Sequence, residues 1–262
     1  MLVQACLLQP GVPIFTVLIT EHFYLLLLAT FCVAAAGYII NDYYDIKIDA
    51  INKPKRLVVG NGINRRQAIL AHMLLSAIGA IIGFSLAWRV GLINAGAVLL
   101  LWGYSAHLKK LFLLGNLAIA FLSATMLLVV AVNFGVDNKA VWAYALFSFI
   151  ISLIREIIKD MEDVKGDVRF GCRTLPIVLG LPRTKWVLYF LLLIFYITVM
   201  AAIIYRRHDL FFGVYMALLV LVPALFFLNK IINADRKKDF SRLSSWCKGL
   251  MFMGILSMLL FR

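Results

Sequence analysis

Long apolar segments dominate this 262-residue chain, which is 63% hydrophobic and only 15% charged. A helix that crosses a membrane needs about 17–25 predominantly apolar residues, and runs of this length recur too often here for a soluble core. Eight segments are expected to span a membrane: 22–40, 67–88, 91–107, 113–134, 139–158, 184–204, 210–231 and 243–261. The sequence therefore predicts an all-α, polytopic membrane helix bundle.

The first 20 residues contain two prolines, Pro10 and Pro13, and no clear span. Residues 2–20 lack both the basic start and the small-residue cleavage site of a secretory signal. We expect them to be the tail of a first helix whose beginning is missing, so that eight full spans follow a partial one. Because the later connections are short and hold no Ser-rich or Pro-rich linker, we expect residues 1–262 to form a single membrane domain.

Basic residues give the expected orientation. One side of the predicted spans carries only five of the 26 Lys and Arg residues, namely Arg89, Lys139, Arg206, Arg207 and Arg262, and the other side carries the remaining 21. Cytoplasmic loops are enriched in Lys and Arg, so the richer side is expected to be cytoplasmic. We interpret the net charge of +13 as a means of attracting anionic lipids and anionic substrates. No nucleic-acid recognition module is visible, and no nucleic-acid partner is expected.

Six of the 13 acidic residues form two triplets with identical spacing: Asp42, Asp45 and Asp49, then Asp160, Asp163 and Asp167. On a helix that turns about 100° per residue, offsets of 0, 3 and 7 bring three carboxylates onto one face. Both triplets lie at the cytoplasmic end of a predicted span. Because a carboxylate at mid-bilayer costs about 2.5–3.5 kcal/mol, we expect the triplets to lie near the interface or in a wet cavity, neutralised by cations.

Two opposed acidic faces are suited to Mg²⁺, which prefers oxygen ligands and is commonly held by a few carboxylates plus substrate phosphates. Metal held in this way stabilises the charge of a departing diphosphate, and nearby Lys and Arg complete the clamp. The alternative is a pair of solvated helix ends whose acids pair with adjacent bases. Repetition of one spacing 118 positions apart (160 minus 42) favours the metal site. Glu156 and Glu162 are expected to be salt-bridge partners rather than ligands.

The segments that follow each triplet carry turn and capping signals. Pro54 is expected to end the first helix, because proline disfavours the α conformation at Lys53. Asn64 with Gln67 resembles a capping box that opens the next helix. After the second triplet, residues 169–180 are expected to form a basic, Gly-containing loop.

The segments Asn41-Asp42-x-x-Asp45-x-x-x-Asp49 and Lys159-Asp160-x-x-Asp163-x-x-Gly166-Asp167 resemble the two signatures of the UbiA family of intramembrane prenyltransferases. Tyr104-Ser105-Ala106-His107-Leu108-Lys109-Lys110, with Gly115-Asn116, is similar to the family's fourth cytoplasmic segment. Asn52-Lys53-Pro54 and Arg173-Thr174-Leu175-Pro176 resemble most its geranylgeranylglycerol-phosphate geranylgeranyltransferase branch. The resemblance implies about nine helices around a central cavity, with Mg²⁺ bridging a prenyl diphosphate to both motifs.

Carried over residue by residue, the resemblance assigns metal binding to Asn41, Asp42 and Asp45 on one face and to Asp160, Asp163 and Asp167 on the other. Asp42, Asp45, Asp160 and Asp163 are the expected catalytic residues. Substrate contacts are expected from Asn41, Asp49, Arg56, Tyr104, Lys109, Asn116, Lys159, Asp167 and Arg173. For the bases, the alternative is a solvated or lipid-facing position. Tyr104 is otherwise an interfacial aromatic, and Asn116 a polar contact between helices.

The activity that the resemblance implies is Mg²⁺-dependent transfer of a prenyl group from a prenyl diphosphate to a lipophilic acceptor. The expected setting is a bacterial or archaeal cell membrane, with membrane lipids as neighbours and the active site facing the cytoplasm. The first choice of acceptor is geranylgeranylglyceryl phosphate, and an aromatic quinone precursor of the hydroxybenzoate or dihydroxynaphthoate type is the alternative. A divalent-cation transporter is a rival of another class. It is disfavoured because both triplets lie at one membrane face rather than near the midplane.

Overall fold

The computed structural model describes residues 2–52, 58–60 and 62–261, and the regular elements in this part of the chain are helical. Seven helices are long and apolar enough to cross a membrane, which confirms the predicted all-α polytopic bundle. They are Glu21–Ile51, Arg65–Leu86, Leu114–Phe134, Lys139–Arg169, Leu175–Tyr205, Leu210–Ile232 and Lys237–Phe261. The protein is therefore an integral membrane protein.

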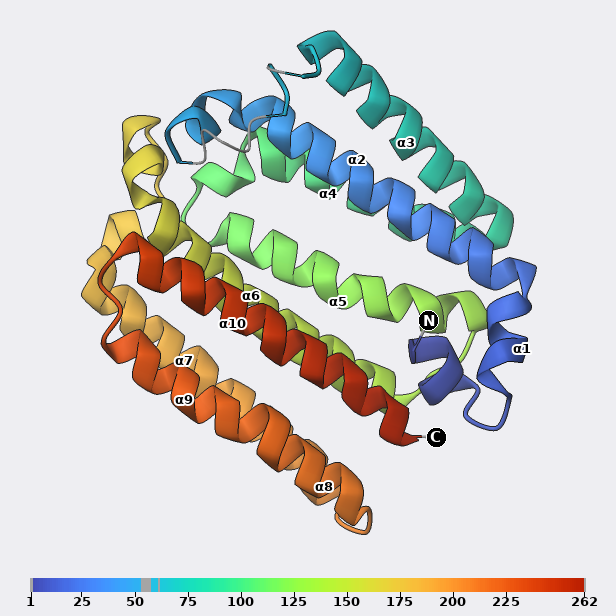
Figure 1. Ribbon diagram of the computed structural model, residues 1–262. Helices are drawn as coiled ribbons and strands as arrows, with labels where there is room; N and C mark the ends of the chain where they lie inside the picture. Colours follow the sequence, from blue (N-terminus) through green and yellow to red (C-terminus); the bar gives the residue numbers. More distant parts are fainter. Residues whose placement is uncertain (1, 53–57, 61, 262) are drawn as a thin grey trace.

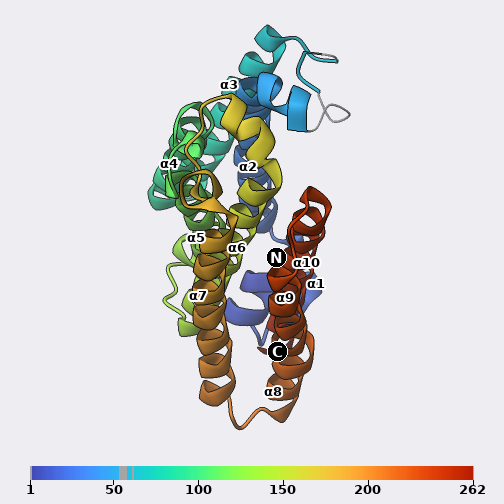
Figure 2. The ribbon, with the colours of Figure 1, turned by 90° about the vertical axis from the view of Figure 1, so that its left-hand side faces the viewer.

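The long helices run side by side along one common direction (Figures 1 and 2). Helix α2 (Glu21–Asn52) packs against α3 (Arg65–Leu86) and α4 (Trp88–Ala106), and α4 also contacts α5 (Leu114–Phe134). Helix α6 (Lys139–Arg169) contacts α2, α5, α7 (Leu175–Tyr205) and α10 (Lys237–Leu256). Of the apolar window of α6, 67% is buried within the protein, against 17–44% for the other six spans. Helix α6 is therefore the central helix.

The predicted span 91–107 forms helix α4, which is 19 residues long. It is not among the seven apolar spans, because the charged Arg89 and the polar Asn94 lower its hydropathy. The amide of Asn94 is buried and donates a 3.0 Å hydrogen bond to the carbonyl of Gly79 on α3. The polar residue thus contributes to helix packing instead of facing lipid.

The N-terminal segment differs from the single helix tail that we expected. A short π-helix, η1 (Val3–Leu8), is followed by a non-helical stretch and then by α1 (Ile14–Ile19). Proline lacks a backbone N–H and is excluded from helix interiors, so Pro10 and Pro13 separate the two pieces. The segment η1 packs against α5, α6 and the C-terminal 3₁₀ turn η5 (Ser257–Phe261).

The predicted loop 169–180 is shorter than expected, because α7 already begins at Leu175. Gly180 has φ 78° and ψ 159°, a conformation that L side chains avoid, and it introduces a kink instead of ending the helix. The span 210–231 is also interrupted: a π-turn, η4 (Ala217–Leu221), joins α8 (Leu210–Met216) to α9 (Val222–Ile232). Pro223 at the start of α9 accounts for this irregularity, since it cannot donate to the preceding turn.

The predicted start of α3 is confirmed. Asn64 accepts a hydrogen bond from the Gln67 backbone at 2.9 Å, and the Gln67 side chain accepts one from the Asn64 backbone at 3.1 Å. This capping box satisfies two of the helix's N-terminal donors. Helix α2 continues through the whole first motif to Asn52, and the predicted stop at Pro54 lies outside the described residues.

Candidate active site

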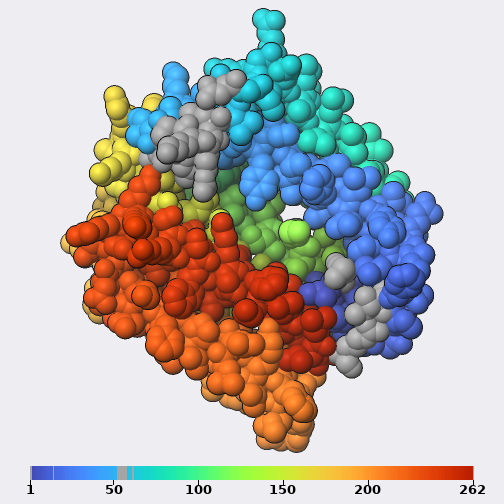
Figure 3. Space-filling model, viewed as in Figure 1, coloured from blue at the N-terminus to red at the C-terminus, as the bar shows by residue number. Residues whose placement is uncertain are grey.

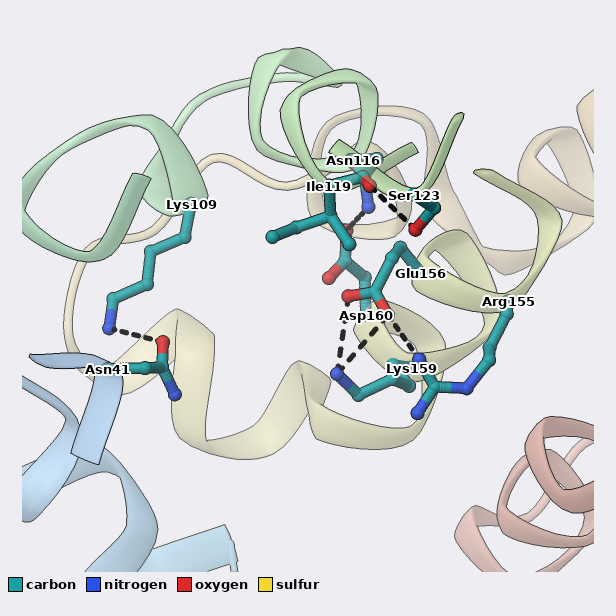
Figure 4. Close-up of polar contacts among 9 residues, drawn as sticks. All are labelled: Asn41, Lys109, Asn116, Ile119, Ser123, Arg155, Glu156, Lys159 and Asp160. Atoms are coloured by element: carbon teal, nitrogen blue, oxygen red, sulfur yellow. Dashed lines mark hydrogen bonds and ion pairs between the residues drawn. The ribbon is translucent and has the colours of Figure 1, made fainter. Parts of the chain in front are cut away.

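The first aspartate motif lies on the last turns of α2 and converges on a lysine from another element. Lys109, on the 3₁₀ turn η3 (Leu108–Lys110), donates a 2.6 Å hydrogen bond to Asp45 Oδ1 and a 3.4 Å one to Asn41 Oδ1. Figure 4 shows the contact with Asn41. Both side chains of the Asp45–Lys109 ion pair are largely buried, with exposed fractions of 14% and 11%. Burial lowers the pKa of Lys109, and the carboxylate of Asp45 opposes this effect by favouring the charged form.

A glycine allows η3 to approach the first turn of α5. A Cβ at Gly115 would lie 2.8 Å from Lys109 Cα and 3.0 Å from the carbonyl oxygen of Leu108, so only glycine fits without a shift of the backbone. The turn between them contains Leu113 with a φ of 60°. The carbonyl of Lys110 accepts a 2.7 Å hydrogen bond from the backbone of Arg173. These contacts hold the Lys109 ammonium over the end of α2.

The second motif lies at the C-terminal end of the central helix α6. Asn116, buried on α5, donates a 2.7 Å hydrogen bond to Asp160 Oδ2 (Figure 4). Asp163 Oδ1 lies 4.0 Å from the ammonium of Lys237 on α10. The helix ends at Arg169, Gly171 follows with a φ of 69°, and the backbone of Cys172 donates to the carbonyl of Asp167 at 3.0 Å. Burial raises the pKa of the Cys172 thiol in this turn, and the charge of Asp167 adds to the effect.

A buried ion-pair group lies one turn before the second motif, on the same helix. Glu156 pairs with Arg155 at 2.6 Å and with Lys159 at 3.2 Å (Figure 4). Its side chain is only 7% exposed, so the two cations compensate a charge that would be costly to bury alone. The expectation that Glu156 is a salt-bridge partner is confirmed.

The two motifs meet around Tyr104 of α4. Its hydroxyl is within electrostatic range of Asp45 from α2 and of Glu156, Asp160 and Asp167 from α6. Acidic residues from both motif helices thus lie within electrostatic range of one tyrosine. That the two motifs together hold one metal-bound substrate stays a prediction.

A cavity of about 320 Å³ extends from this space between α2, α4, α5 and α6. Its polar end is lined by Asn41, Tyr104, Arg155, Glu156 and Lys159. The remaining wall is mostly apolar and includes Val33, Leu101, Ile119, Leu122, Met126 and Val129. In the space-filling view the surface is hollowed between α2 and α10, with α5 visible behind (Figure 3). A ligand with an anionic head and a hydrocarbon tail matches this division.

The expected site residues do not all lie at the cavity. Asn41, Tyr104 and Lys159 line it, and Asp45, Lys109, Asn116 and Asp160 lie beside it through the contacts above. Asp42, Asp49, Asp163 and Asp167 are half-buried on the two motif helices. Arg173 has an exposed side chain and contributes its backbone, and Arg56 lies outside the described residues. Within the described part of the chain, no three acidic, His or Cys side chains are close enough to hold a metal ion unaided.

Sequence reasoning missed some polar residues of the cavity. Arg155 and Glu156 line its polar end, and Thr30, Asn94, Ser123 and Thr125 line its walls. A polar residue within an apolar span is a signal for a cavity-facing position, and Asn94 provided that signal. The orientation of Arg155 carried no such signal, because it depends on which face of α6 is turned toward α5.

A membrane bundle with two acidic helix ends opening on an amphipathic cavity fits the class of intramembrane enzymes that act on lipidic anions. The model of the UbiA prenyltransferase family matches residues 2–256, and the chain belongs to this family.

Relatives in this family are archaeal proteins named digeranylgeranylglyceryl phosphate synthase. The protein of Korarchaeum cryptofilum is 32% identical over 231 residues, covering 87% of this chain and 81% of the relative. That of Pyrococcus horikoshii is 39% identical over 156 residues, covering 60% of this chain and 56% of the relative. The matched region covers little more than half of the length of the relatives from Pyrococcus horikoshii, Methanothermobacter thermautotrophicus and Methanosarcina mazei.

Solved structures share the fold. One described as a digeranylgeranylglyceryl phosphate synthase in membranes has a TM-score of 0.70 at 25% identity, covering 98% of this chain and 89% of that one. A UbiA homolog from Archaeoglobus fulgidus bound to GPP and Mg²⁺ has a TM-score of 0.68 at 17% identity, covering 98% and 92%. Divalent metal is thus bound within this family.

Proposed function

We propose that this protein transfers a prenyl group from a prenyl diphosphate to geranylgeranylglyceryl phosphate within the membrane. The observation that carries the proposal is a cavity whose polar end is lined by Asn41 of the first motif and Lys159 of the second, while its walls are mostly apolar. A prenyl diphosphate has the same two-part character. The names of the archaeal relatives support the choice of acceptor.

Mg²⁺ is the proposed cofactor, and the side chains at the site fit it. Asn41, Asp42 and Asp45 would offer oxygen ligands from α2, and Asp160, Asp163 and Asp167 would offer them from α6. Such ligands, few in number and completed by substrate phosphates and water, are typical of Mg²⁺ sites. When bound, the metal would neutralise the diphosphate and make it a better leaving group.

Lys109 is proposed to change partners when substrate binds. Its ammonium contacts Asn41 Oδ1 and Asp45 Oδ1, the same oxygens that a divalent ion would use. With Asn41 and Asp45 holding Mg²⁺, the Lys109 ammonium would be free to turn toward the phosphate oxygens. Lys159, Arg173 and Arg56 are the other proposed diphosphate contacts, and Asp49 and Tyr104 border the same polar space.

Residues of the protein promote attack at the allylic carbon in two ways. Bases at the polar end stabilise negative charge on the departing diphosphate, and the apolar walls exclude water that would quench a carbocation-like transition state. Asn116 orients Asp160 by donating to one of its oxygens. The hydroxyl of the acceptor attacks as the diphosphate leaves, and substrate or released diphosphate takes its proton.

Residues 1–262 are proposed to work as one membrane domain, with the active site facing the cytoplasm. The motif ends of α2 and α6 lie on the side that carries 21 of the 26 basic residues, and this charge bias supports the orientation. An archaeal cell membrane is the proposed location, because the named relatives are archaeal.

The test is an assay of purified protein with Mg²⁺ and radiolabelled geranylgeranyl diphosphate. Geranylgeranylglyceryl phosphate is compared with 4-hydroxybenzoate and dihydroxynaphthoate as acceptors. The proposal expects turnover with the glyceryl phosphate that disappears on chelation of the metal. Turnover with an aromatic acceptor alone would instead establish the quinone-precursor activity. Magnesium flux in proteoliposomes without prenyl transfer would establish a transporter.

A further inference from the structure

A second cavity, of about 500 Å³, lies far from the aspartate motifs. It is lined by residues from the start of α6, the end of α7, the start of α8 and the C-terminal turn η5. Its residue Lys139 and the motif residue Asp160 lie 21 positions apart on α6 (160 minus 139), which corresponds to about 31 Å of helix. The second cavity therefore lies near the opposite membrane face.

Most of this cavity is hydrocarbon-like. Ala143, Leu146, Phe147, Ile197, Ala201 and Ala202 are among its lining residues, and they come from the facing surfaces of α6 and α7. The small alanines leave a depression between the two helices that can hold a chain. In a bilayer such a depression fills with a lipid tail, because the alternative is a void.

One cation is built into the mouth of this depression. The guanidinium of Arg206 lies 3.9 Å from the centre of the Phe261 ring and 5.0 Å from that of Phe212, and it pairs with Asp209 at 2.7 Å through Nη2. Its other terminal nitrogen, Nη1, is buried and has no hydrogen-bond partner among the described residues. The Arg206 side chain as a whole is 24% exposed and lines the cavity.

The local charge favours an anion. Lys139 also lines the cavity, so two of the five basic residues on this sparsely basic side of the protein meet here. Asp209 offsets only one of these charges. Guanidinium groups bind phosphate through paired N–H donors, and Nη1 supplies such a donor.

We propose that this cavity is a binding site for an anionic phospholipid of the bilayer, distinct from the active site. The phosphate lies against Arg206 and Lys139, and one acyl chain occupies the depression between α6 and α7. The lipid completes the hydrogen bonding of Arg206 and anchors the junction of α7, α8 and the C-terminal turn. The inference does not rest on the proposed enzymatic activity.

The test is native mass spectrometry of delipidated protein titrated with phosphatidylglycerol or phosphatidylcholine of identical chains. Wild type is expected to bind the anionic lipid at least tenfold more tightly. Arg206→Gln and Lys139→Gln should each reduce this preference at least threefold, and Arg207→Gln, the matched charge removal next to the cavity, should not. Ala202→Leu, which fills the depression, should weaken the binding of both lipids.

Two controls keep the proposal falsifiable. Arg206→Gln also removes contacts with Asp209 and Phe261, so thermal unfolding in detergent identifies a misfolded variant, and Lys139→Gln leaves those contacts intact. Asp45→Asn should keep the lipid preference, because Asp45 belongs to the proposed active site and does not line this second cavity. Equal binding of the two lipids by wild type would overturn the proposal. An unchanged preference in Lys139→Gln, or an equal loss in Arg207→Gln, would also overturn it.

Discussion

The two aspartate motifs have the same spacing, but their acids have different neighbours. Asp45 of the first motif is paired with a cation, the ammonium of Lys109, at 2.6 Å. Asp160 of the second motif accepts a hydrogen bond from a neutral amide, that of Asn116, at 2.7 Å, and the ammonium nearest to Asp163, that of Lys237, is 4.0 Å away. An ammonium competes with a metal ion for the oxygens it contacts, whereas an amide donor orients a carboxylate without neutralising it. The same sequence signature can therefore give two sites with different affinities for a cation.

Loss of either motif should have the largest effect. Asp45→Ala and Asp163→Ala are each expected to lower prenyl transfer by about 10³-fold or more, because each removes a proposed metal ligand and with it stabilisation of the departing diphosphate. The measurement is turnover with geranylgeranyl diphosphate, with thermal unfolding in detergent to verify folding. Asp235→Ala is the matched control, because that side chain is 80% exposed. Retained turnover in either motif variant would argue against the metal assignment.

The position of Lys109 should matter next. Gly115→Ala places a Cβ 2.8 Å from Lys109 Cα and pushes η3 away from α5, which displaces Lys109, so we expect a higher KM for the diphosphate and about a 10- to 100-fold loss of kcat/KM. Gly103→Ala is the control, since its Cβ meets no atom within 4 Å. An unchanged KM in Gly115→Ala would mean that Lys109 does not need its observed position.

A smaller effect should separate the two motifs directly. Lys109→Gln removes the competing ammonium, so Mg²⁺ in the absence of diphosphate should bind several-fold more tightly. Asn116→Ala removes the amide that donates a hydrogen bond to Asp160, at a cost of about 1–3 kcal/mol, and should weaken Mg²⁺ binding. Isothermal titration with Mg²⁺ gives both values. If both variants shift the affinity in the same direction, the motifs are equivalent and the comparison fails.

Much of the fold could be predicted from the sequence, because membrane-spanning helices require long apolar segments and helix caps require particular residues at a fixed spacing. The capping box at Asn64 is one example. The start of α7 at Leu175 was missed because Gly180 was interpreted as part of a loop, whereas in the structure it forms a kink within α7. The π-turn before Pro223 was missed for a similar reason. A glycine or proline indicates an irregularity in a helix, but it does not indicate whether the helix continues beyond that residue.

The candidate site was predictable where residues carry a motif and unpredictable where a partner comes from another helix. Asp45 and Asp160 lie, as expected, toward the C-terminal ends of two long helices, α2 and α6. The Asp45–Lys109 pair depends on how η3 folds over α2, and the position of Arg155 depends on the rotation of α6 about its axis. Both are set by packing between distant segments, which the spacing of residues along one helix does not specify.

The most direct test of the account is a double-mutant cycle on Mg²⁺-dependent binding of geranylgeranyl diphosphate. Binding is measured for wild type, Asp45→Asn, Asp163→Asn and the double variant. If both motifs hold one diphosphate through shared metal, each single variant should lose nearly all Mg²⁺-dependent affinity, and the double variant should lose little more. Additive losses, or a single variant that binds as wild type does, would contradict the claim that the two motifs form one site.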